Sequence, residues 1–174
     1  MSNLAQELTG SFIKAEQLDL LYLSIISLLD MVKDGEIDLV LDQEGKSVKQ
    51  KRLFIDKLID GIHSPELAES LRQQPLEFFY EKDFGPFLEQ LKKEADKFEI
   101  VRITVALEFK EVDLREMTAF LSEKLGKPTV LSIKLDKNLF GGAIVQHGSF
   151  QSDFSLHTQL DIFRSRWHKA VVAQ

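Results

Sequence analysis

Apolar residues recur at intervals of three and four along the first 98 residues, which is the spacing of one face of a helix. The longest such stretch begins at Leu18 and ends near Gly35. The same spacing, together with residues that start or stop helices, predicts further helices over 3–14, 47–61, 64–74 and 84–98. Residues 36–45 are left open between strand and loop, because their apolar positions alternate while Gly and Asp residues flank them.

The pattern changes at Ile100, where a run of β-branched residues to Leu107 predicts a strand. Asp113 is expected to cap a helix that ends at Gly126. Strands over 129–135 and 139–147, a further short strand over 150–154 and a final helix complete the order. We therefore predict an α+β protein, with an N-terminal all-α helical bundle domain over 1–98 and a small C-terminal α+β domain (strand-helix-strands-helix) over 99–174.

Composition narrows the classes of partner. The chain has 174 residues and a net charge of -6, so we do not expect a general nucleic-acid-binding protein. Residues 1–98 carry 12 basic and 19 acidic side chains, whereas 99–174 carry 10 and 9, so the helical domain should prefer basic partners. There is no Cys, which excludes disulfides and thiolate chemistry. The apolar stretch 18–32 is interrupted by polar residues and falls short of the roughly 20 residues of a membrane span, so membrane contact is expected only through a partner.

The glycine pair Gly141-Gly142 lies inside an otherwise apolar run and needs a physical reason, since glycine weakens a strand. A bulge, or close approach by another backbone or a ligand, would supply one. A phosphate loop is disfavoured because no Lys-Ser/Thr follows the glycines and the run continues as a strand. We expect the strand to bend or to accept close backbone packing here, with Asp153 and Ser155 as the turn and cap that begin the last helix.

Catalytic chemistry has few candidates. His147, Asp153 and His157 could form a small metal-dependent hydrolase site, and His157 lies four residues before Asp161, on the same helical face. The chain lacks the Gly-x-Ser-x-Gly elbow of a serine hydrolase. Solvated polar positions are the favoured interpretation, so no catalytic, cofactor-binding or metal-binding residue is predicted.

The final helix is the strongest candidate for a docking surface. Phe163 and Trp167 lie on its apolar stripe, and Arg164 is adjacent to that stripe. The basic residues at this end either offset the helix dipole or form a docking patch, and Trp with Arg is a frequent combination in the centre of interfaces. In the helical domain, Leu21 and Ile25 are the predicted partner-binding positions.

One segment carries a family resemblance. This segment resembles the delta subunit of F-type ATP synthases, the bacterial counterpart of the oligomycin-sensitivity-conferring protein. The shared pattern is an Asp, an apolar pair, two glycines, an alternating strand, a turn glycine and then Asp-x-Ser before a helix. The residues are Asp136, Leu139, Phe140, Gly141, Gly142, Ile144, Gly148, Asp153, Ser155 and Leu160. The stator subunit of V-type ATPases carries a related Gly-Gly strand and is the alternative.

The resemblance implies a non-catalytic stator subunit of a bacterial-type synthase. The helical domain would grip amino-terminal segments of the alpha subunits, and the C-terminal domain would join the b subunits of the peripheral stalk. Rotation would thereby be coupled to ATP synthesis. The protein would lie at the cytoplasmic face of the bacterial plasma membrane without crossing it, and would need no cofactor.

Overall fold

The computed structural model describes the backbone of residues 2–172 and the side chains of 4–80 and 82–164. Its described part divides into two compact units. Unit 1 comprises residues 2–12 and 16–98, and unit 2 comprises residues 13–15 and 99–172. The chain therefore passes between the units three times.

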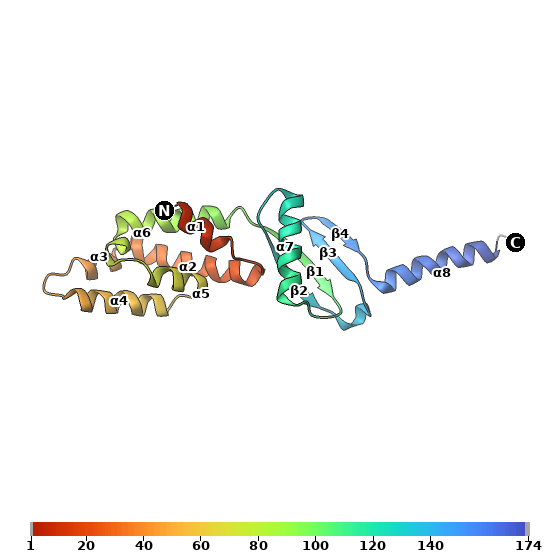
Figure 1. The fold of residues 1–174 in the computed structure, drawn as a ribbon, viewed down its shortest axis with the longest axis horizontal. Coiled ribbons are helices and arrows are strands. Elements are labelled where there is room, and N and C mark those ends of the chain that lie inside the picture. Colours follow the sequence, from red (N-terminus) through yellow and green to blue (C-terminus); the bar gives the residue numbers. More distant parts are fainter. Residues whose placement is uncertain (1, 173–174) are drawn as a thin grey trace. The chain divides into compact units, whose positions relative to one another are not determined.

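Unit 1 is helical (Figure 1). Its elements are α1 (Ser2–Thr9), α2 (Ala15–Lys33), α3 (Glu36–Leu41), α4 (Val48–Asp60), α5 (Pro65–Arg72), the 3-10 turn η1 (Leu76–Phe79) and α6 (Glu81–Ala95). The helical interpretation of the first 98 residues is confirmed. Among the described helices of the chain, none combines the length and apolar character needed to cross a membrane.

Local capping explains where two of these helices begin. Ser47 Oγ accepts from Gln50 N at 3.4 Å, and Gln50 Oε1 accepts from Ser47 N at 2.9 Å, so these two residues form a capping box. Ser64 Oγ accepts from Leu67 N at 3.3 Å, with Pro65 as the first helical residue. Both starts satisfy backbone donors that would otherwise lack partners.

The core of unit 1 is built from one face of α2 and from phenylalanines around η1 and α6. Phe79, Phe84 and Phe87 are fully buried. The ring centroids of Phe79 and Phe84 lie 5.3 Å apart, and those of Phe84 and Phe87 lie 6.5 Å apart. Aromatic rings at such distances add specific contacts to a large area of buried apolar surface. The α2 side chains in this core are Leu18, Leu21, Ile25, Leu28, Leu29 and Val32.

Residues 36–41 form a helix, which neither alternative from the sequence included. Ile37 and Leu41 are buried four residues apart, whereas Leu39 is exposed. The apparent alternation therefore hides a helical i, i+4 pair, which packing in the bundle selects.

Unit 2 is a mixed sheet with a helix on one face (Figure 1). Its elements are β1 (Glu99–Val105), α7 (Glu111–Leu125), β2 (Thr129–Leu135), the 3-10 turn η2 (Lys137–Leu139), β3 (Ala143–His147), β4 (Phe150–Asp153) and α8 (Leu156–Val172). The strand order is β2-β1-β3-β4. The β1–β2 pair is parallel, and α7 lies between these strands in the chain, whereas the other two pairs are antiparallel. The α+β class and the element order are confirmed.

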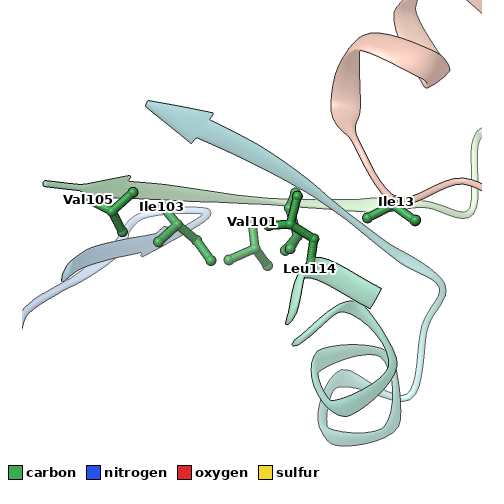
Figure 2. Close-up of a cluster of buried hydrophobic side chains, with 6 residues drawn as sticks. Ile13, Val101, Ile103, Val105 and Leu114 are labelled. Atoms are coloured by element: carbon green, nitrogen blue, oxygen red, sulfur yellow. The ribbon is translucent and has the colours of Figure 1, made fainter. Parts of the chain in front are cut away.

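The unit 2 core lies between this sheet and α7 (Figure 2). Val101, Ile103 and Val105 project from alternate positions of β1 and meet Leu114 of α7. Ile13 joins the same cluster because Leu131 N donates to Ile13 O at 2.8 Å, at the outer edge of β2. A segment near the start of the chain thus contributes to the core of unit 2.

Several element boundaries differ from the sequence expectations. The first helix ends at Thr9 rather than near 14, because residues 13–15 belong to unit 2. The helices expected to begin at Phe84 and Asp113 begin earlier, at Glu81 and Glu111. Asp113 is therefore the third residue of α7 and not its N-cap. Asp113 Oδ2 instead accepts from Lys110 N at 3.2 Å.

Candidate functional site

The glycine pair passes directly beside the segment that starts α8. Leu156 N donates to Gly141 O at 3.0 Å, and Phe154 N donates to Ala143 O at 2.8 Å. A Cβ at position 142 would overlap the Phe154 carbonyl oxygen and lie 2.9 Å from Ser155 Cα. Only glycine permits this approach at position 142, so close backbone packing explains Gly142. A Cβ at Gly141 would meet no atom closer than 3.9 Å, and that residue differs by its φ of 154°.

The backbone around the pair also adopts conformations that favour glycine. Gly142 has a φ of 77°, and Phe140, just before the pair, has a φ of 56°. The expected strand over 139–147 therefore begins only at Ala143, because the left-handed residues and η2 interrupt it. Phe140 is a non-glycine residue in this region, and its side chain is exposed.

Asp153 and Ser155 form the cap of α8. Asp153 Oδ1 accepts from Ser155 N at 2.8 Å, and Oδ2 accepts from Thr158 Oγ1 at 2.7 Å. Ser155 Oγ accepts from Thr158 N at 3.3 Å, which satisfies a donor of the first helical turn. The hydrogen bonds from Ser155 and then from Thr158 lower the pKa of Asp153. The sequence prediction of a turn and cap at these residues agrees with this geometry.

Asp136 and Gly148 shape the two turns that flank β3. Asp136 Oδ1 accepts from Asn138 N at 2.9 Å and so begins η2. Gly148 has a φ of 56° in the two-residue turn between β3 and β4. Six of the ten residues that carry the family resemblance therefore act on the backbone around β3 and α8: Asp136, Gly141, Gly142, Gly148, Asp153 and Ser155.

Beyond this junction, α8 presents apolar side chains to solvent. Leu156, Leu160 and Phe163 step by four and three residues, and all three are exposed. Arg164 Nη1 lies 3.9 Å from Asp161 Oδ1. The side chain of Trp167 lies outside the described residues. The described part of α8 thus offers an exposed apolar stripe next to a basic residue.

The structure places Leu21 and Ile25 in the core of unit 1, each 0% exposed. They do not offer a contact surface while the bundle is folded. The opposite face of α2 instead exposes Leu20, Leu23 and Ile26, which we call the α2 outer stripe. Exposed acidic residues flank this stripe at positions 16, 19 and 30. The sequence signal for it was the set of apolar positions left outside the main helical stripe.

The histidines considered for catalysis do not converge with a third ligand. His147 Nε2 lies 3.4 Å from Glu99 Oε2, and His157 Nε2 lies 3.3 Å from Asp161 Oδ2. Within the part of the chain that the structure describes, no group of three or more His, Cys, Asp or Glu side chains is arranged to hold a metal ion. These two contacts are separate, partly exposed pairs.

Sequence comparisons with known proteins point to one family. The model of the family described as ATP synthase delta (OSCP) subunit matches residues 14–166. ATP synthase subunit delta of Sulfurihydrogenibium azorense is 25% identical over 147 residues, covering 79% of this chain and 77% of that protein. ATP synthase subunit delta of Clostridioides difficile is 25% identical over 163 residues, covering 88% and 87%. Among solved structures, a chain of the Toxoplasma gondii mitochondrial ATP synthase hexamer is 17% identical, with coverage of 95% and 96% and a TM-score of 0.37.

Replacing Gly142 should destabilise the fold more than replacing another left-handed glycine. We expect Gly142→Ala to lower the free energy of unfolding by about 3 kcal/mol, since it adds steric overlap to an unfavourable φ. Gly148→Ala is the matched control, because its φ is also positive but no atom lies within 4 Å of the added Cβ. It should cost about 1 kcal/mol. Urea unfolding followed by circular dichroism measures both, and equal costs would contradict the close-packing explanation.

The Asp153 cap should also make stability depend on pH. Because the folded-state pKa of Asp153 is lowered, its stabilising effect is present above its ordinary pKa and is lost as the pH falls through the folded value. Asp153→Asn should therefore reduce stability at pH 7 and flatten the decline of stability below about pH 4. Thermal unfolding of both proteins between about pH 7 and pH 2.5 tests this. An unchanged acid slope in the variant would mean that the cap is not the titrating group.

Proposed function

The chain belongs to the ATP synthase delta (OSCP) subunit family, whose model spans most of it, and from this premise we propose how it links its partners. As a member of this family it is a structural subunit of the peripheral stalk of an F-type ATP synthase and is not an enzyme. Membership of this family favours the F-type interpretation over the V-type one, and it leaves no reason to interpret the chain as a hydrolase. Our proposal concerns the finer role: unit 1 holds the catalytic head, unit 2 holds the b subunits, and rotation in a bacterial-type synthase is thereby coupled to synthesis.

The observation that carries this proposal is that each unit exposes an apolar helical stripe. In unit 1 it is the α2 outer stripe, and in unit 2 it is the stripe of Leu156, Leu160 and Phe163 on α8. A stator needs two separate binding surfaces because it must resist torque between two bodies. Apolar side chains at helical spacing are the usual anchors when one helix docks on another.

For the head, the occupant of the α2 outer stripe would be an amphipathic, basic segment of an alpha subunit. Glu16, Asp19 and Asp30 are exposed beside the stripe, and residues 1–98 have an excess of acidic side chains. Opposite charge around an apolar centre speeds association and selects the orientation of the bound helix. The apolar centre supplies most of the binding free energy.

For the stalk, the occupant of the α8 stripe would be a helix of the b subunits. Phe163 and Arg164 lie in this part of α8, and Trp167 follows one turn later in the sequence. The Asp153 and Ser155 cap, together with the Gly141–Leu156 hydrogen bond, determines where α8 begins. In the assembled synthase we place the protein at the cytoplasmic face of the plasma membrane, in contact with the membrane only through the complex.

Head binding should depend on the exposed face of α2. We expect Leu23→Ala to weaken binding of an alpha amino-terminal peptide about 10-fold, the usual loss on truncating a central apolar anchor. Leu53→Ala on α4 is the matched control, because Leu53 is 56% exposed and Leu23 is 55% exposed. Isothermal titration calorimetry gives both affinities. Equal affinity for the two variants would remove α2 as the head-binding helix.

Stalk binding should depend on α8 in the same manner. Phe163→Ala and Trp167→Ala should each weaken binding of a b-subunit carboxyl-terminal fragment about 10-fold or more while the protein stays folded. Phe120→Ala on α7 is the control, since Phe120 is 57% exposed and Phe163 is 61% exposed. Surface plasmon resonance with the immobilised b fragment compares them. If Phe120→Ala gave the larger loss, the stalk would bind α7 rather than α8.

A further inference from the structure

The β4 strand leaves one side of its backbone without a partner strand among the described residues. It is an edge of the sheet, since the strand order ends with β4. The other edge, on β2, is covered by the bridge between Lys14 and Leu131. An uncovered edge strand is a template for pairing with another strand, and proteins usually protect it with Lys, Pro or a bulge. Residues 150–153 contain neither Lys nor Pro.

The register of β4 shows which backbone groups are available. Phe154 N donates to Ala143 O at 2.8 Å, so positions 150, 152 and 154 direct their N–H and C=O groups toward β3. The groups of Gln151 and Asp153 therefore point away from the sheet. Two donors and two acceptors are thus presented at the edge, spaced as in an antiparallel strand pair.

The residue types on the two sides of Ser152 in this segment are nearly symmetric. Two phenylalanines, Phe150 and Phe154, lie two residues away on either side, and both are exposed. They project to the same face as Ser152, because side chains alternate along a strand. Gln151 and Asp153 occupy the intervening positions on the opposite face. This order is apolar, polar, small, polar, apolar.

From this geometry we propose that β4 pairs with β4 of a second copy, antiparallel, about a two-fold axis at Ser152. In this register Gln151 faces Asp153 of the second copy, so the outward backbone groups of both residues meet and form a hydrogen-bonded pair on each side of the axis. The Gln151 amide can also donate to the Asp153 carboxylate of the second copy. Each Phe150 lies opposite a Phe154, which covers four exposed aromatic side chains. Two four-stranded sheets become one sheet of eight strands.

The two-fold arrangement is favoured over a foreign strand because the segment is complementary to itself. An isologous interface requires that each surface group meet the group it needs on an identical copy, and the Phe, Gln and Asp positions satisfy this condition. The contact is short, well below the roughly 1,200 Å² of stable interfaces, so the dimer is weak and reversible. It is independent of the stator role, since it uses neither the α2 outer stripe nor the stripe on α8.

The two-fold axis allows a sharp experiment, because residue 152 meets only itself. Ser152 makes no side-chain hydrogen bond that the fold needs, so charge can be placed there. In Ser152→Lys or Ser152→Glu dimers, like charges would face each other, whereas a mixture of the two variants would pair opposite charges. Asn138→Lys adds the same charge at an exposed position on η2 and is the control.

Sedimentation velocity of the full chain from about 5 to about 500 µM, the range for a weak interface, gives the readout. We expect the unmodified protein and Asn138→Lys to dimerise with rising concentration, each Ser152 variant to dimerise at least 10-fold more weakly, and their equimolar mixture to recover the dimer. Gln151→Pro, which removes an outward N–H without breaking the β3 ladder, should also abolish it. A monomer at every concentration, an unaffected Ser152→Lys dimer, or a mixture no better than its components would overturn the proposal.

Discussion

Where Gly142 passes Phe154 and Ser155, two backbone segments lie closer than any side chain at position 142 would allow. This approach joins the start of β3 to the residues that begin α8 through the Gly141–Leu156 and Ala143–Phe154 hydrogen bonds. It places the Asp153 cap and the start of the last helix against the beginning of β3. The glycine pair, for which a ligand was one possible reason, therefore reflects a packing requirement at Gly142.

The two units use apolar surface differently. In unit 1, α2 is apolar on two faces: one fills the core and the other, at Leu20, Leu23 and Ile26, stays exposed. In unit 2, the sheet and α7 enclose a small core, and α8 keeps most of its described apolar side chains in solvent. Exposed apolar side chains at helical spacing lower the solubility of a protein unless another helix covers them. A structural subunit of a larger complex is expected to carry surfaces of this kind.

The short connection between α1 and α2 pairs with a strand that is distant in the sequence. Ile13 and Lys14 run beside Leu131 of β2, so this connection belongs to unit 2 although it lies among the helices of unit 1 in the chain. It covers one edge of the sheet and leaves β4 as the open one. The chain therefore crosses between unit 1 and unit 2 three times, on entering and on leaving residues 13–15 and again after Phe98.

Much of this architecture could be predicted from the sequence because it depends on neighbours within about four residues. The capping box at Ser47, the N-caps at Ser64 and Ser155 and the strand that begins after Phe98 are of this kind, as is the need for a special backbone at the glycine pair. Only the tertiary structure decided which apolar face of α2 is buried, that 36–41 is helical, and that Ile13 joins the sheet. Those outcomes depend on contacts between residues distant in the chain, and apolar periodicity shows that a face will be covered without showing by which partner.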